Sequence, residues 1–267
     1  MFTKSDILSQ LAAMGAPRDS IVLMHTSLRL IGEVEGGAKG LLDALIEYFT
    51  AEGGLLCIPT HTGRNIIKEY LLDLTTSESH LGAFPIFATE DGRGIRTENP
   101  SHSMVIFGNR ERAEKFAEGE LEVDSPTSPK SCYGKIYDEG GKILLVGVNQ
   151  SKNTYLHCVE EMLGVEHRMT VEKIPVKIKR KDGQVVCREI HWFDESYVGD
   201  ASHRFPKYEL AFRYHGCITD GFVGDAPTQL CDARKMKDVL ELIKNRAGKV
   251  DPLADDAPFP PKWYCKK

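Results

Sequence analysis

Two short apolar runs on either side of a helical pattern constrain the fold of this chain more than any other feature. Residues 21–24 and 55–58 are each apolar and each end at a polar segment, as buried strands do where they release a loop. Between two Gly-Gly pairs, apolar residues recur at helical spacing: Leu41, Leu42, Leu45, Ile46 and Phe49. This strand, helix, strand unit favours a right-handed parallel crossover, which would place both polar loops at one edge of the sheet.

The middle and second half of the chain predict further strands and a hairpin. Residues 171–179 and 185–193 flank the dipeptide Asp182-Gly183, which favours an antiparallel hairpin between them. Two further buried strands are expected at residues 103–107 and 143–148, and a helix is expected at residues 153–163. The sheet is therefore predicted to be mixed.

A last helix is expected near the C-terminus, with Thr228 as its N-cap and an end before Gly248. Its apolar face would carry Leu230, Met236, Val239, Leu240 and Ile243. No internal repeat, low-complexity tract or linker divides the sequence. We therefore expect residues 1–267 to form a single α/β domain, with a central mixed β-sheet flanked by helices and an antiparallel hairpin in its C-terminal half.

Composition and charge exclude several classes of partner. The chain has 267 residues, of which 41% are hydrophobic and 27% charged, an ordinary balance for a protein that buries a core. Its net charge of -5 and pI of about 6.0 provide no attraction for phosphate backbones or anionic lipid. Nucleic acids and membrane surfaces are therefore not expected partners.

The N-terminus and the cysteines indicate a cytoplasmic protein. Polar residues interrupt the first 20 residues, so an amphipathic helix is expected there rather than a signal peptide or a membrane span. The seven cysteines are odd in number, widely scattered and free of any C-x-x-C pair. This usage fits a reducing cytoplasm.

Three polar segments are candidates for a functional site. His25-Thr26-Ser27-Leu28 follows the first strand, and backbone N–H groups and hydroxyls at such a turn can hold a phosphate; an ordinary hydroxyl-rich turn explains the same residues. Residues 96–103 place a cation, hydroxyls and an imidazole before a buried strand, which fits either a polar site or an exposed turn. Spacing alone does not decide between the two interpretations of either segment.

The third segment, residues 153–160, carries the residue best suited to acid–base chemistry. His157 and Glu160 lie three positions apart, so they share one face if the segment is a helix, and a carboxylate there can orient an imidazole. Such an imidazole could remove a proton from an attacking amine. Spacing alone nevertheless favours a solubilising His-Glu pair on a helix surface.

Several other chemistries lack their usual sequence signals. The remaining histidines form no i, i+4 pair and no Cys/His cluster, so no metal site is expected. No G-x-S-x-G elbow or Walker loop occurs, and Gly92-Arg93-Gly94 is too short for a dinucleotide fingerprint.

Taken in order, these segments resemble the aminoglycoside 3-N-acetyltransferase family, over about residues 20 to 245. Ordered agreement of several unrelated motifs is more specific than any one of them. The matching stretches are His25-Thr26-Ser27-Leu28 with Gly36-Gly37-Ala38, Ile58-Pro59-Thr60-His61-Thr62, Arg96-Thr97 with Pro100 and His102-Ser103, residues 125–134, Leu144 to Val148, Asn153-Thr154-Tyr155-Leu156-His157 with Glu160, and Gly224 with Ala226.

The resemblance implies an α/β fold distinct from the common small acetyltransferase fold, with acetyl-CoA as co-substrate in a cleft and direct transfer to an amine. It implies a small-molecule amine acceptor, such as the 3-amino group of a 2-deoxystreptamine aminoglycoside, and a link to antibiotic resistance. It makes His157 the general base and Glu160 its acidic partner. The oligomeric state stays open, a homodimer included. The same resemblance implies that these residues face CoA: His25, Thr26, Ser27, Thr60, Thr97, His102, Ser103, Ser131 and Asn153.

The sequence departs from the family pattern at three positions. Cys132 replaces a proline after Ser131. Asn99-Pro100 stands where the family has His-Pro, and residues 63–80 lack the Asp-Pro and Trp/Pro-rich segment of many resistance enzymes. These last two departures touch the acceptor side.

Two other interpretations remain open on the sequence. Cys158 or Cys132 could accept the acyl group as a nucleophile, although consecutive helix residues such as His157 and Cys158 point apart. The chain could also be a CoA-binding or regulatory protein that has lost catalysis.

Overall fold

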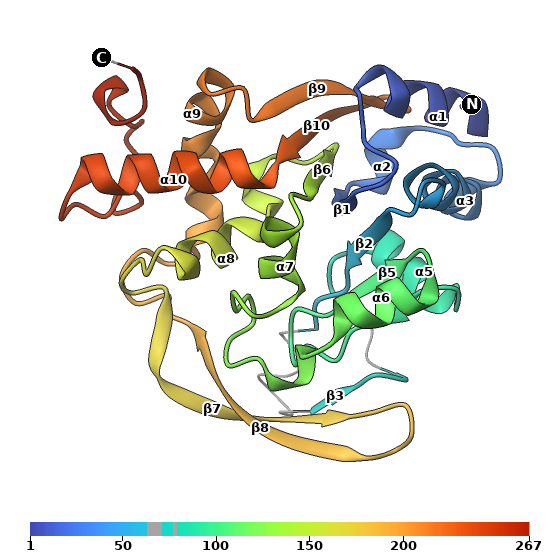
Figure 1. Cartoon of the computed structure of the whole chain (residues 1–267), viewed down its shortest axis with the longest axis horizontal. Coiled ribbons are helices and arrows are strands. Elements are labelled where there is room, and N and C mark those ends of the chain that lie inside the picture. Colours follow the sequence, from blue (N-terminus) through green and yellow to red (C-terminus); the bar gives the residue numbers. More distant parts are fainter. Residues whose placement is uncertain (63–70, 77–78, 267) are drawn as a thin grey trace.

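The computed structural model describes residues 1–62, 71–76 and 79–266. Its centre is a seven-stranded mixed sheet with the order β4-β5-β2-β1-β6-β10-β9 (Figure 1). The strands are β1 (Ile21–Thr26), β2 (Leu55–Pro59), β4 (Ile95–Arg96), β5 (Met104–Phe107), β6 (Lys142–Val146), β9 (Ile218–Val223) and β10 (Ala226–Asp232).

The first two strands and the helix between them follow the predicted unit. β1 pairs in parallel with β2 on one side and with β6 on the other, while β5 and β10 run antiparallel to their neighbours. The connecting helix α3 (Gly37–Thr50) buries the expected residues Leu41, Leu42, Leu45 and Phe49. The prediction of a central mixed sheet is therefore confirmed.

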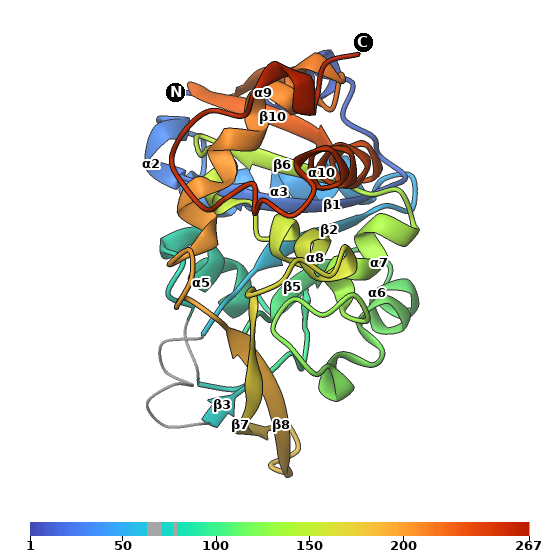
Figure 2. The ribbon, with the colours of Figure 1, turned by 90° about the vertical axis from the view of Figure 1, so that its left-hand side faces the viewer.

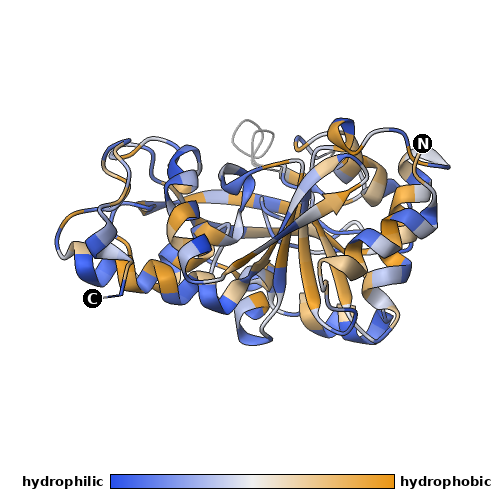
Figure 3. Ribbon diagram, turned by 90° about the horizontal axis from the view of Figure 1, so that it is seen from above, coloured by the Kyte–Doolittle hydropathy of each residue, from blue (hydrophilic) through white to orange (hydrophobic). Residues whose placement is uncertain are grey.

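Helices cover both faces of the central sheet, because successive strand residues point to opposite sides. Val22 and Met24 of β1 pack with α1 (Lys4–Ala13), α3 and α5 (Ala83–Glu90). Ile21 and Leu23 pack on the other side, and Figure 3 shows hydrophobic residues concentrated in the strands between these layers. The helices of that second side are α6 (Arg110–Ala117), α7 (Cys132–Asp138), α8 (Tyr155–Met162), α9 (Glu209–Tyr214) and α10 (Ala233–Ala247).

The predicted hairpin is confirmed, but it belongs to a second, smaller sheet. Strands β7 (Met169–Lys179) and β8 (Val185–Phe193) pair antiparallel, and β3 (Leu71–Asp73) joins β7 in parallel. Gly183 has φ +85° in the turn, which a glycine adopts without strain. Figure 2 shows the hairpin extending away from the central sheet.

The expected start of the last helix is wrong. Thr228 and Leu230 lie in β10, which pairs with both β6 and β9. α10 begins later, and its N-cap is Asp232, whose side chain accepts a hydrogen bond from the Lys235 amide. The helical residues Met236, Val239, Leu240 and Ile243 are buried as expected. An aspartate caps a helix as well as a threonine does, so local signals did not distinguish the two starts.

The remaining elements are short. α2 (Leu28–Ile31) follows β1 directly. Among the described residues, the 3₁₀ segments η1 (Glu120–Glu122), η2 (Gln150–Lys152) and η3 (Ala201–Tyr208) lie between longer elements, and η4 (Pro261–Trp263) follows α10. Of these, η2 and η3 border the site described next.

Candidate active site

A cavity of about 380 Å³ opens at the carboxyl ends of β1 and β2. His25 and Thr26 end β1 there, and Ile58 and Pro59 end β2. The loops before α5 and α8 and the segment after β8 complete its walls. The two parallel strands thus bring their polar ends to one edge of the sheet, where open α/β sheets bind ligands.

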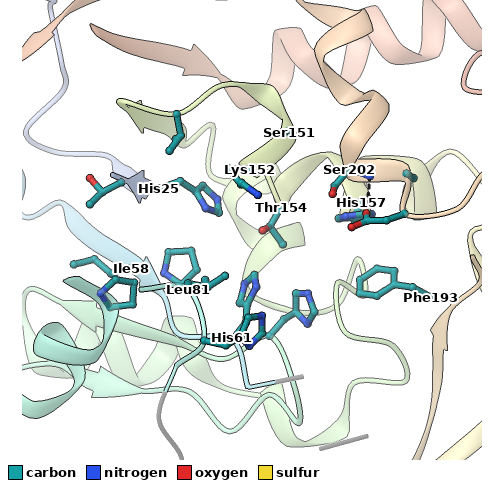
Figure 4. Close-up of a pocket in the computed structure, with 18 of the residues that line it drawn as sticks. His25, Ile58, His61, Leu81, Ser151, Lys152, Thr154, His157, Phe193 and Ser202 are labelled. Carbon is teal, nitrogen blue, oxygen red and sulfur yellow. Dashed lines mark hydrogen bonds between the residues drawn. The ribbon is translucent and has the colours of Figure 1, made fainter. Parts of the chain in front are cut away.

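His157 lies in the first turn of α8 and contributes to the cavity wall. Its half-buried ring lies between Phe193 and Phe205, with ring centroids 4.7 Å from each (Figure 4). Burial lowers the pKa of His157 to about 4; the charge of Asp200 opposes this and that of Arg168 adds to it. The imidazole is therefore uncharged at neutral pH and can accept a proton.

The Glu160 carboxylate pairs with Arg168 and not with His157. One of its carboxylate oxygens accepts a hydrogen bond of 2.8 Å from Nε of Arg168, which in turn donates two to Asp251 at 2.8 and 2.9 Å. Its other carboxylate oxygen has no partner among the described residues. The structure therefore does not bring Glu160 into hydrogen-bond contact with His157, and the charged triad ties α8 to the start of β7 and the C-terminal segment.

Asp200 is a carboxylate whose charge acts on His157. It lines the cavity just before η3, and its Oδ1 accepts a hydrogen bond of 2.9 Å from the Ser202 amide. Burial alone would raise the pKa of Asp200, but the bonds from Ser202 and the nearby His157 keep it below its usual value. This carboxylate is therefore ionised at neutral pH.

Three of the predicted CoA-facing residues line the cavity: His25, Thr26 and His102. Nδ1 of His102 lies 2.8 Å from the Ser101 hydroxyl, and its ring stacks near that of His61, with centroids 4.0 Å apart. Nε2 of His61 lies 2.9 Å from the Tyr133 hydroxyl. Burial lowers the pKa of both His61 and His102 well below the usual value, so this wall is polar but uncharged.

The other predicted CoA-facing residues are absent from the cavity wall and bond within the protein. The Thr60 and Ser103 hydroxyls lie 3.0 Å apart, and that of Thr97 accepts from the Met104 amide. The Ser131 side chain caps α7, and the Asn153 amide group donates to Gln150 at 2.9 Å. The Ser27 amide donates to the Val146 carbonyl at 2.9 Å. These contacts hold the loops around the site in place.

The two cysteines considered as nucleophiles are buried away from the cavity. Burial raises the pKa of the Cys132 and Cys158 thiols well above the usual value, which disfavours the reactive thiolate. In the part of the chain that the structure describes, no group of three or more His, Cys, Asp or Glu residues could hold a metal ion. Within the same residues, no helix has the length and apolarity needed to cross a membrane.

Comparison with known proteins identifies the family. The model of the aminoglycoside 3-N-acetyltransferase family matches residues 23–243. The chain belongs to this family. It is therefore an acetyltransferase, as the ordered motifs predicted.

Relatives of this acetyltransferase cover nearly its whole length. Aminoglycoside N(3)-acetyltransferase IV of Salmonella sp is 24% identical over 257 residues, covering 94% of this chain and 88% of the relative. The aminoglycoside N(3')-acetyltransferase-like protein YokD of Bacillus subtilis is 25% identical, covering 90% and 91%.

Solved structures of the family share the fold. AAC-IIIb in a binary complex with CoASH superposes with a TM-score of 0.77 at 22% identity, covering 94% of this chain and 99% of that one. A mutant of AAC(3)-IVa in complex with a gentamicin has a TM-score of 0.76 at 24% identity, covering 99% and 94%. The expected α/β fold of the family is confirmed.

Sequence reasoning on this acetyltransferase missed several residues of the cavity wall. Phe193, Asp194, Glu195 and Asp200 all come from the end of β8 and the segment after it. Lys152 lies in η2, one residue before the Asn-Thr motif. No local sequence pattern distinguishes these residues. Lys152 lies directly before a motif that matches the family, and His61, another residue of the cavity wall, lies within one.

Proposed function

We propose that this chain transfers an acetyl group from acetyl-CoA directly to an amine of a small polar acceptor, with His157 as the general base. The observation that carries the proposal is the uncharged imidazole of His157 in the wall of the cavity, within the field of the Asp200 carboxylate. Asp200, rather than Glu160, is the carboxylate that we propose supports the charged imidazolium during the reaction.

The reaction proceeds in one complex of both substrates. The amine nitrogen attacks the thioester carbon and forms the C–N bond, the carbonyl π pair moves onto oxygen, and His157 takes the proton that the nitrogen loses. The carbonyl then reforms, the C–S bond breaks, and the CoA thiolate takes the proton from His157. General-base catalysis of this kind typically contributes about 10²–10⁴-fold.

The acetyl-CoA side of the cavity is proposed to lie near η2. Val148, Ser151 and Lys152 line both the catalytic cavity and an adjoining cavity of about 750 Å³. Two cavities that share these residues suit a long co-substrate, and the Lys152 ammonium suits its phosphates. A solved relative, AAC-IIIb, holds CoASH, which supports this assignment.

The acceptor is proposed to be a polycation whose reacting amino group is unprotonated, with the 3-amino group of a 2-deoxystreptamine aminoglycoside as the specific candidate. Asp194, Glu195 and Asp200 line one side of the cavity, and carboxylates attract polycations. Solved relatives hold a gentamicin and sisomicin. We place this activity in a single cytoplasmic domain, an assignment that the seven free cysteines support.

Release of CoA across a panel of amines, including 2-deoxystreptamine aminoglycosides, tests the proposal. Acetyl-CoA-dependent thiol release with at least one amine is expected. Flat rates with aminoglycosides but turnover of another amine would remove the aminoglycoside assignment alone. CoA binding by calorimetry without thiol release from any amine would instead indicate a CoA-binding protein.

Intact mass after mixing with acetyl-CoA separates direct transfer from a cysteine route. Direct transfer predicts an unchanged mass. A stable acetyl adduct that disappears in Cys158→Ala or Cys132→Ala would overturn direct transfer, although the buried thiols argue against it.

A further inference from the structure

We infer that Nε2 of His25 donates a hydrogen bond to the thioester carbonyl oxygen of the acyl donor and stabilises the oxyanion formed there. His25 would thus be a second catalytic residue, opposite in role to the base His157. The inference rests on the proposed function, because it assigns a group to the same acyl-transfer step.

The position of His25 places its side chain on the face of the sheet that α8 covers. Alternation along β1 puts His25 on the same face as Ile21 and Leu23, which belong to the same hydrophobic cluster as Leu156 and Val159 of α8. β6 pairs with β1 as far as Thr26, with His25 opposite Leu145, so the end of the strand is held on that side. Figure 4 shows the imidazole of His25 in the cavity, near Lys152.

His25 has a buried polar atom without a partner. The residue is 7% exposed, and its Nε2 has no hydrogen-bond partner among the described residues. Leaving such a group unpaired costs free energy, so each case calls for an explanation. His61 and His102 line the same cavity, but each has a hydroxyl partner at 2.9 or 2.8 Å. The unsatisfied hydrogen-bonding capacity of Nε2 of His25 therefore indicates that a ligand binds there.

The neighbouring residue carries another unpartnered polar atom, on the opposite face of β1. The hydroxyl oxygen of Thr26 is also buried and unpartnered within the described chain, and Thr26 lines the cavity. The backbone amide of Ser27, another donor close by, already bonds to the Val146 carbonyl. Nε2 of His25 is thus an unpartnered donor on the side of β1 that α8 covers.

The charge state of His25 suits a donor that does not exchange its proton. Burial, with a contribution from the Lys152 ammonium, lowers the pKa of His25 to about 3. The ring is neutral at physiological pH, and with its single proton on Nε2 it can donate one hydrogen bond. When the carbonyl π pair moves onto oxygen, this bond strengthens, while no bond to His25 forms or breaks. Loss of one such donor typically lowers kcat about 10²–10³-fold.

Infrared difference spectra of ¹³C-carbonyl acetyl-CoA bound to the protein test the inference directly. A donor at the carbonyl oxygen lowers the stretching frequency of the bound thioester below that of free acetyl-CoA. In His25→Leu we expect the frequency to return towards the free value and kcat to fall about 10²–10³-fold, with little change in KM for acetyl-CoA. His25→Gln, which retains an N–H donor, should keep part of the shift and of the activity.

His157→Ala is the matched control, since it removes the base and leaves His25 in place. It should keep the carbonyl shift of the wild type while turnover falls. An unchanged shift in both His25 variants would overturn the inference and leave the proposed function intact. Failure of the wild type to bind acetyl-CoA would instead overturn the proposed function, and the inference with it.

Discussion

Replacing Arg168 with methionine would leave the carboxyl of Glu160 buried without its cation. Arg168 is 5% and Glu160 1% exposed, so water screens their ion pair little. Removing one partner of a buried pair typically costs about 3–5 kcal/mol. Asp251, the other partner of Arg168, lies nearer the surface and can be hydrated. We therefore expect the free energy of unfolding to fall by about 3 kcal/mol, the lower end of this range.

The pH dependence of this loss follows from the carboxyl left behind. Burial raises the pKa of Glu160 to about 7, and Arg168 opposes the rise; without Arg168 the pKa rises further. A raised carboxyl pKa means that the folded protein binds the proton more tightly than the unfolded chain does. Below about pH 7 this carboxyl is protonated in both folded proteins. Above it the wild-type carboxyl ionises beside Arg168 while that of the variant stays protonated, so the variant's deficit should grow as pH rises above about 7.

Urea unfolding of the wild type, Arg168→Met and the double variant with Glu160→Gln measures this loss. Neutralising the buried carboxyl should recover part of it, because residues in contact couple by about 0.5–3 kcal/mol. A loss under about 1 kcal/mol in Arg168→Met, the value of a surface pair, would refute the structural role given to this triad.

Three further outcomes are expected. In a pH profile, kcat/KM should fall at acid pH, where His157 with a pKa of about 4 takes up a proton. Asp200→Asn should shift this fall to lower pH, because the Asp200 carboxylate raises the pKa of His157. An unchanged profile in this variant would remove Asp200 from the mechanism. Thr60→Val should lower the free energy of unfolding in urea by about 1 kcal/mol and leave the acetyl-CoA affinity measured by calorimetry unchanged, because the Thr60 hydroxyl bonds to Ser103. Weaker acetyl-CoA binding by this variant would instead indicate that Thr60 contacts CoA. Asp194→Asn and Glu195→Gln should each raise KM for a polycationic amine up to about fivefold, and a larger effect on a monoamine would contradict the charge argument.

Much of the fold could be predicted because its signals are local. The buried runs of β1 and β2, the helical spacing of α3 and the Asp182-Gly183 turn each report on a few neighbouring residues. The pair β9 and β10 was missed because Thr228 and Leu230 fit a capped helix as well as a strand, and pairing with β6 decides between the two. The second, smaller sheet depends on contacts between distant segments in the same way.

The site was predictable to the extent that its residues lie in ordered motifs. The motifs led to His157, His25, Thr26 and His102, and all four line the cavity. Asp200 comes from a polar segment far along the chain, and its position depends on tertiary packing. Conversely, the hydroxyls predicted to face CoA are satisfied within the protein, which no sequence pattern reveals. Those of Thr60 and Ser103 bond to each other, and that of Thr97 accepts from the Met104 amide.

The most direct test of the account is the rate of CoA release by His157→Ala, measured at saturating acetyl-CoA and amine beside the wild type. With His157 as the base in direct transfer, turnover should fall about 10²–10⁴-fold, while calorimetry shows CoA affinity largely intact. Turnover near the wild-type rate would contradict the assignment of His157 as the base.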